Sequence, residues 1–257
     1  SVLFDGKNLL EMGEKELDEI RGNRITMIFQ DPLTSLNPVF TVGNQITESI
    51  RKHLHLSKEE AAKRAESVLE KVGMPDAHAA MKKYPHTLSG GMRQRAMIAM
   101  ALCCNPALLI ADEPTTALDV TIQAQIMSLL KELREEIGMS IILITHDIGL
   151  VASMADRVLV MYAGQIIEEA PAKEIFRAPR HPYTKALLAT VPSIYDGDDR
   201  ELVSIPGIVP EGYDDIPGCR FADRCEYRRP ECDKPQENYS FGEKHRAKCV
   251  VMKEEEK

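Results

Sequence analysis

Short apolar segments alternate with helix-length segments over residues 107–162 of the chain. Residues 107–112, 140–145 and 157–162 are mostly apolar and have the length of strands, whereas residues 121–137 and 148–154 have helical periodicity. Strands that are apolar on both faces are typical of parallel sheets, because the crossover helices cover both sides of such sheets. This alternation therefore predicts an α/β fold with a parallel sheet at its core.

The segments before residue 107 predict a small hairpin followed by helices. Residues 2–4 are expected to form a strand that turns at Asp5-Gly6, residues 14–21 a helix, and residues 25–29 a strand closed by Pro32. Helices are expected over residues 42–54, 57–72 and 92–104. Ser57 and Glu60 have the spacing of a capping box, which predicts that a helix begins there.

The composition changes beyond Pro179. Residues 165–169 are expected to pair back on residues 157–162 through a turn at Ala163-Gly164. After Pro179, prolines and glycines become frequent and we expect no further strand. The sequence therefore predicts a main domain over residues 1–178 and a coil-dominated, cysteine-rich extension over residues 179–257.

Charge and hydropathy exclude some classes of protein. The net charge is −8 and there is no basic tail, so non-specific binding to nucleic acid is not favoured. No apolar run approaches the ~20 residues that a spanning helix needs, and no signal peptide is visible. We therefore expect a cytoplasmic protein that reaches a membrane only through a partner.

Residues 88–95 read Leu-Ser-Gly-Gly-Met-Arg-Gln-Arg and open an expected helix. The hydroxyl of Ser89, the backbone N–H groups of Gly90 and Gly91, and the positive end of the helix suit a phosphate. We include Gln94 among the candidate nucleotide contacts. The structural alternative is a serine N-cap with glycines in a loop, which would be preferred if only Ser-Gly-Gly were present.

Two carboxylates end the apolar strand at residues 108–111. Asp112 is suited to hold Mg²⁺ and Glu113 to polarise an attacking water, because ligands of open α/β sheets bind at the carboxyl ends of the strands. The alternative is that both are only solubilising charges at a strand end. The pattern, however, continues through residues 114–118 to Asp119, a further candidate nucleotide contact.

Gln30 and His146 also follow apolar strands and are expected at the same sheet edge. Gln30 could contact a metal-bound or attacking water, and His146 could reach a γ-phosphate. Each of these residues taken alone has a structural role at least as often as a functional one. Their functional reading rests on the neighbouring motifs.

The six cysteines fall into two groups. Cys103 and Cys104 lie in an apolar helical segment, where core packing is expected. The other four, Cys219, Cys225, Cys232 and Cys249, lie near the end of the chain. In a cytosolic protein such a cluster favours metal or cluster binding over disulfides. Its spacing matches neither a zinc ribbon nor a ferredoxin motif.

Together, these motifs resemble the nucleotide-binding subunit of ABC transporters. Residues 88–95 resemble the signature motif, residues 108–113 the Walker B strand and residues 116–119 the D-loop, while Gln30 and His146 resemble the Q-loop glutamine and the switch histidine. The resemblance implies binding and hydrolysis of ATP with Mg²⁺ held by Asp112 and Gln30. It also implies a helical subdomain over about residues 31–88 that docks on a membrane-spanning partner.

Two further segments are similar to the dipeptide and oligopeptide importer branch. These are residues 28–38, Ile-Phe-Gln-Asp-Pro-Leu-Thr-Ser-Leu-Asn-Pro, and residues 181–188, His-Pro-Tyr-Thr-Lys-Ala-Leu-Leu. This resemblance implies peptide import by two ATP-binding subunits beneath two transmembrane permease subunits, with an extracytoplasmic peptide-binding protein. Some relatives in this branch carry a [4Fe–4S] cluster, so we place iron–sulfur ahead of zinc for the four cysteines. The cargo, whether peptide, nickel or another solute, and the identity of the second ATP-binding subunit stay open.

No Gly-x-x-x-x-Gly-Lys-[Ser/Thr] phosphate loop occurs in the 257 residues. The resemblance implies that this loop precedes the segment seen here, so we expect a fragment that cannot complete its own ATP site but can offer Ser89 to Gly91 to a partner's site. A one-sided subunit and a non-catalytic iron–sulfur scaffold are the alternatives. A DNA-maintenance ABC ATPase is disfavoured, because residues 31–87 are too few for a long coiled coil.

Overall fold

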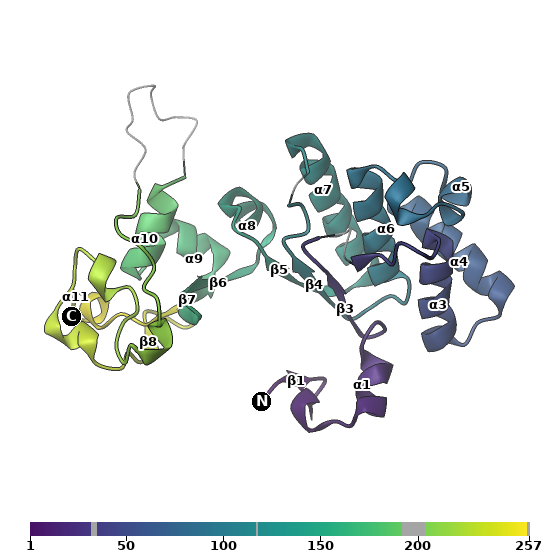
Figure 1. Cartoon of the computed structure of the whole chain (residues 1–257). Coiled ribbons are helices and arrows are strands. Elements are labelled where there is room, and N and C mark those ends of the chain that lie inside the picture. The colour runs from purple at the N-terminus through teal and green to yellow at the C-terminus, as the bar shows by residue number, and fades with distance from the viewer. Residues whose placement is uncertain (32–34, 117, 192–203, 256–257) are drawn as a thin grey trace. The chain divides into compact units, whose positions relative to one another are not determined.

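The computed structural model of the chain describes residues 1–31, 35–116, 118–191 and 204–255 (Figure 1). These residues divide into two compact units, Ser1–His146 and Asp147–Lys257. The division falls earlier than the expected domain end at residue 178. The reason is that strand β7 (Gln165–Pro171), which precedes that point, pairs with strand β9 (Arg246–Ala247) near the end of the chain.

A three-stranded parallel sheet forms the centre of the first unit. Its order is β3 (Ile25–Ile28), β4 (Leu108–Asp112) and β5 (Ser140–Ile144), with β4 in the middle. Leu109 and Ala111 on β4 are completely buried. The parallel order confirms the predicted α/β core and places the carboxyl ends of all three strands at one edge.

The first residues form the expected hairpin. Strand β1 (Leu3–Phe4) pairs with β2 (Lys7–Asn8), and both turn residues, Asp5 and Gly6, have positive φ. The short 3-10 helix Leu9–Glu11 and helix α1 (Glu14–Ile20) then lead to β3.

Helices α3 (Val42–Leu54), α4 (Lys58–Lys71) and α5 (Ala77–Met81) pack together, and α3 and α4 also contact α6 (Gly90–Leu102) (Figure 1). The capping box at Ser57 and Glu60 is confirmed by reciprocal hydrogen bonds. The 3-10 helix Pro85–Thr87 leads into α6, which begins at Gly90, two residues earlier than predicted. Helix α7 (Val120–Ile137) connects β4 to β5.

The second unit contains an antiparallel sheet in the order β6 (Arg157–Tyr162), β7, β9 and β8 (Tyr239–Ser240). The turn at Ala163-Gly164 is confirmed, and both of its residues have positive φ. The expected pairing of residues 165–169 with residues 157–162 is confirmed, since β7 pairs with β6. The expectation of no further strand after Pro179 was wrong, because β9 pairs with the edge of β7 and β8 pairs with β9.

The remaining elements of the second unit are helices and short turns. They are α8 (Ile148–Met154), α9 (Ala172–Arg177), α10 (Pro182–Ala189), the 3-10 turns Tyr213–Asp215, Ala222–Arg224 and Pro230–Asp233, and α11 (Val250–Glu255). One apolar cluster joins Tyr162 and Ile175 to Phe221, and a second joins Cys232 and Cys249 to neighbouring apolar side chains. The C-terminal region is therefore packed as part of this unit, despite its low content of regular structure.

Strand β5 carries apolar side chains that are only partly covered. Among the described residues it pairs with β4 alone, and Ile142 and Ile144 are 49% and 47% exposed. On β6, Leu159 and Met161 are similarly exposed at 48% and 60%. Each unit thus presents a strand edge with uncovered apolar residues beside it.

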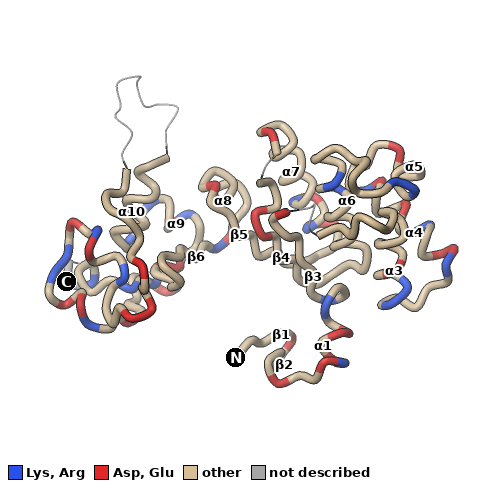
Figure 2. The backbone as a smooth tube through the Cα atoms, viewed as in Figure 1, with Lys and Arg blue, Asp and Glu red and all other residues tan. Residues whose placement is uncertain are grey.

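Charged residues of both signs occur along both units of the structure. Lys and Arg are interspersed with Asp and Glu along both units (Figure 2). Within the described ranges, no helix combines the length and apolar character that crossing a membrane requires.

Candidate functional site

Glu113 lies immediately after β4, at the carboxyl edge of the parallel sheet. Its φ of 44° is left-handed, a conformation that residues other than glycine seldom adopt. The N–H of Glu113 still donates to the carbonyl of Ile144 on β5 at 2.9 Å, and its own carbonyl accepts from Thr116 at 3.1 Å. The chain therefore turns sharply at Glu113 while its backbone stays anchored to the sheet.

Three side chains surround the Glu113 carboxylate. Gln30 Nε2 and the Thr116 hydroxyl each donate to Oε2 at 2.8 Å, and His146 Nδ1 lies 3.0 Å from Oε1. Gln30 and His146 follow the two strands that flank β4, so the prediction that these residues meet at one sheet edge is confirmed. The contact of Thr116 with Glu113 was not predicted, although residues 116–119 resemble the D-loop.

These partners favour the ionised form of Glu113. Hydrogen bonding to His146 lowers the pKa of the Glu113 carboxyl most, followed by the hydrogen bond from Thr116, with a smaller effect from Gln30. The Glu113 side chain is 24% exposed and that of His146 78% exposed, so both remain accessible to a ligand. An accessible, ionised carboxylate next to an imidazole can accept a proton from water.

Asp112 and Gln30 are the predicted Mg²⁺ ligands. Asp112 ends β4 and is partly buried, and the Gln30 amide nitrogen faces Glu113, which leaves its carbonyl oxygen for other partners. Among the described residues, no three His, Cys, Asp or Glu side chains are arranged to hold a metal ion. Mg²⁺ is usually held by one or two carboxylates together with phosphate oxygens, so the oxygen donors at this edge fit that ion in the presence of nucleotide.

Ser89 caps the signature helix α6. Its hydroxyl oxygen accepts a hydrogen bond from the N–H of Met92 at 3.4 Å, and the side chain is exposed. Gly90 and Gly91 form the first turn of α6, and a Cβ on Gly91 would lie 3.4 Å from the Ile122 side chain. Both readings of the motif are thus compatible, because an N-cap serine at an accessible helix N-terminus also presents N–H groups to an anion.

Gln94 and Asp119 have structural partners. Gln94 is only 3% exposed, and its amide donates to the carbonyl of Pro114, which ties α6 to the segment after Glu113. The nucleotide contact expected of Gln94 stays a prediction, and its buried amide has a structural partner in the structure. The carboxylate of Asp119 caps α7 by accepting from Ile122 N–H at 2.9 Å. Residue 117 of the predicted D-loop and residues 32–34 after Gln30 lie outside the described residues.

The four C-terminal cysteines border one small pocket in the second unit. Its lining includes His181, Gln236 and Lys248 beside Cys219, Cys225, Cys232 and Cys249. Each sulfur accepts at least one backbone hydrogen bond: Cys219 from Phe221, Cys225 from Tyr227, Cys232 from Arg229, and Cys249 from Val251 and Met252. Burial raises the pKa of Cys219 to about 11 and also raises the pKa values of Cys225 and Cys249. Burial therefore favours the neutral thiol form of Cys219, Cys225 and Cys249.

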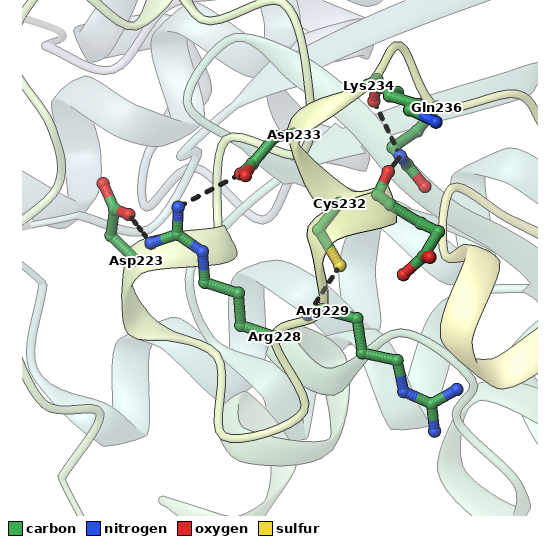
Figure 3. A network of polar contacts seen from close by, with 8 residues as sticks. Asp223, Arg228, Arg229, Cys232, Asp233, Lys234 and Gln236 are labelled. Atoms are coloured by element: carbon green, nitrogen blue, oxygen red, sulfur yellow. Dashed lines mark hydrogen bonds and ion pairs between the residues drawn. The ribbon is translucent and has the colours of Figure 1, made fainter.

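The loop that carries Cys232 is braced on both sides (Figure 3). Arg228 forms ion pairs with Asp223 and with Asp233, the latter at 3.1 Å. The Gln236 amide donates to the carbonyls of Glu231 at 3.0 Å and Lys234 at 2.7 Å. These contacts fix the backbone on either side of Cys232.

Comparison with known protein families gives two matches. The family described as "ABC transporter" matches residues 1–116, and the family described as "Oligopeptide/dipeptide transporter, C-terminal region" matches residues 167–232. A probable peptide ABC transporter ATP-binding protein of Sinorhizobium fredii is 53% identical over 226 residues, covering 88% of this chain and 68% of that protein. The chain belongs to the ATP-binding subunits of peptide-importing ABC transporters.

Other relatives and solved structures agree with this assignment. The oligopeptide transport ATP-binding protein OppD of Bacillus subtilis is 56% identical over 88% of this chain and 63% of its own length, and a putative peptide import ATP-binding protein of Brucella abortus is 51% identical over 97% and 75%. The ATP-binding cassette MJ0796, solved as a dimer with ADP and Pi, has a TM-score of 0.59 and 33% identity over 66% of this chain and 72% of its own. The protein is thus an ABC-type transport ATPase with the corresponding α/β fold.

Proposed function

We propose that Glu113 is the general base of ATP hydrolysis and that His146 and Gln30 position both this carboxylate and the attacking water. The convergence of three strand ends on one accessible, ionised carboxylate supports this assignment. Water oxygen would attack the γ-phosphorus, its proton would pass to Glu113, and the β–γ bridging oxygen would leave with ADP. Mg²⁺, held by Asp112 and the carbonyl oxygen of Gln30, would neutralise phosphate charge.

In this proposal each nucleotide site forms between two ATP-binding subunits, one of which gives the phosphate loop and the other the signature motif. Ser89, Gly90 and Gly91 lie at the exposed start of α6 and would face a nucleotide held by the phosphate loop of the other subunit. The dimeric relative MJ0796 supports such a pairing. Two expectations stay predictions: that the sequence is a fragment, and that it cannot hydrolyse ATP without a partner.

Coupling to transport would run through the helical subdomain at residues 31–88. Helices α3, α4 and α5 form a separate packed group beside the sheet, which suits docking on transmembrane permease subunits. The subunit would lie at the cytoplasmic face of the membrane, and an extracytoplasmic peptide-binding protein would deliver the cargo. The peptide-import names of its relatives support this assignment.

A Glu113→Gln variant of the native subunit, assembled with its permease and partner ATPase, tests the catalytic proposal. Loss of the general base should lower ATP hydrolysis by about 10²- to 10⁴-fold while ATP still binds. Glu135→Gln, on the exposed side of α7, is the matched control and should hydrolyse ATP normally. A Glu113→Gln transporter that hydrolyses ATP at the normal rate would show that another group is the base.

We propose also that the four-cysteine pocket binds a [4Fe–4S] cluster, with zinc as the alternative. Support comes from the thiol donors and from the backbone N–H groups directed at each sulfur, since such bonds stabilise metal-bound thiolates. Against this, the described residues contain no group of three donors set for a single metal ion. Anaerobic purification followed by iron, sulfide and zinc analysis tests the proposal. Zinc alone would exclude the cluster, and a metal-free pocket would exclude both.

A further inference from the structure

A buried carboxylate lies on strand β7, outside both sites described above. Glu168 is 1% exposed, and its neighbour Ile167 is also buried, at 5%. The pairing of β6 with β7 skips Ile167: Val160 is opposite Glu168, whereas Met161 is opposite Ile166. This β-bulge places two consecutive side chains in the interior, which normal strand alternation would not do.

Three donors from two different segments meet the Glu168 carboxylate. The backbone N–H groups of Arg180 and His181 donate to it at 2.6 and 2.8 Å, and His245 Nε2 lies 2.7 Å from Oε1. His245 is 5% exposed. A buried carboxylate requires such partners, because leaving an ionised or polar group without them in the interior is costly.

Both of these segments lead directly into the four-cysteine pocket. The first one supplies His181 and Pro182, and His181 Nε2 lies 3.9 Å from the sulfur of Cys219. The second one continues from His245 through β9 to Lys248 and Cys249, and the Lys248 N–H donates to the carbonyl of Ile167 in the bulge at 2.8 Å. The two adjacent residues of the bulge, Ile167 and Glu168, thus hold both of the segments that line the pocket.

We infer that Glu168 and His245 form a positioning pair that assembles the four-cysteine pocket. The carboxylate holds the start of α10 and the segment around His245 on the same strand, so that His181, which contacts Cys219, and Cys249 line the same pocket. Gln is a poor replacement for Glu168, because its NH₂ group would meet N–H donors where the carboxylate presents an acceptor. The inference concerns the protein's own segments and does not require that the pocket binds a metal.

The rate at which individual cysteines react with a thiol reagent tests this inference. The full-length protein is first treated with reductant and chelator, and alkylation of each cysteine is followed by mass spectrometry. Glu168→Gln should accelerate labelling of Cys219 and Cys249 by at least about tenfold, because a buried charge-assisted network is broken. Cys103 and Cys104, buried in the other unit, should react at unchanged rates and report on that unit's integrity.

Glu169→Gln is the matched control on the same strand. Glu169 pairs with Arg157 and is partly exposed, so its replacement should leave the labelling rates unchanged. A second pair of variants separates positioning from general stability. His245→Leu should accelerate labelling, and His245→Gln, which retains an N–H donor, should restore most of the protection. Normal labelling in Glu168→Gln, or equal acceleration by Glu169→Gln, would overturn the inference.

Discussion

Gly218 lies next to Cys219 at a point where two backbone segments touch. A Cβ on residue 218 would lie 2.2 Å from the carbonyl oxygen of Cys232 and 2.6 and 2.8 Å from the backbone C and Cα of Asp233. Ordinary van der Waals contacts begin near 3.4 Å, so Gly218→Ala must push the two segments apart by more than about 1 Å. All three obstructing atoms are backbone, and no side-chain rotation relieves the clash.

The free-energy cost of Gly218→Ala has two parts. Overpacking of this kind costs about 1–3 kcal/mol, and loss of the hydrogen bond from Cys219 N–H to the Cys232 carbonyl, 2.8 Å long, costs about 0.5–1.5 kcal/mol. We therefore expect local destabilisation of about 1.5–4.5 kcal/mol, which corresponds to an open pocket that is populated roughly 10- to 2000-fold more often.

Native-state hydrogen exchange measures this population through the amides of Cys219 and Cys232. Gly13→Ala is the control, since its Cβ would meet only Glu16 Oε2, at 3.9 Å. It should leave exchange in the second unit unchanged. If Gly218→Ala exchanges at these amides like the unaltered protein, the close backbone approach, and with it our account of the pocket, is wrong.

Three further predictions concern the sheet-edge site. Thr116→Val should raise the pKa of Glu113 and lower ATP turnover in the assembled transporter, whereas Thr116→Ser should restore both the pH profile and the rate. Gln94→Leu should destabilise the first unit by about 1–3 kcal/mol in denaturant unfolding, because the buried carbonyl of Pro114 loses its donor. His146→Ala should move the acidic limb of the pH–rate profile to higher pH. In the folded protein the pKa of Glu113 is depressed, chiefly by His146, so the carboxylate stays ionised below the ordinary glutamate range. Without the histidine this pKa rises, and the ionised form is lost at a higher pH.

Local patterns in the sequence were sufficient to predict much of this fold. The apolar run ending at Asp112 is the central strand β4, the Ser57 capping box begins α4, and the Ala163-Gly164 turn joins β6 to β7. Each of these features depends on residues close in the chain, whose periodicity or turn chemistry is visible in the sequence. Placement of Gln30, Glu113 and His146 at one edge followed from the rule that parallel strands align their carboxyl ends.

Features that depend on contacts between distant segments could not be predicted. The amide of Gln94 reaches Pro114 only because α6 packs beside the turn after β4, so its burial is not visible in the signature motif. Glu168 is one of two consecutive acidic residues in the sequence of β7, and a β-bulge, which has no sequence signal here, turns it inward. The pairing of β9 with β7 likewise depends on tertiary contact, because a two-residue strand has too little pattern of its own.

The arrangement of donors around Glu113 indicates where an attacking water can bind. An ionised carboxylate offers about four acceptor positions, and Gln30 and Thr116 occupy both positions on Oε2. His146 Nδ1 must donate to Oε1, because the carboxylate only accepts, which leaves one position on Oε1 and directs His146 Nε2 away from Glu113. A water bound at that position would lie beside the imidazole, with the Nε2 edge available to a γ-phosphate. Glu113 and His146 would then act on the same water and phosphate, while Gln30 and Thr116 keep the carboxylate oriented. This arrangement explains why replacing either Glu113 or His146 should reduce hydrolysis.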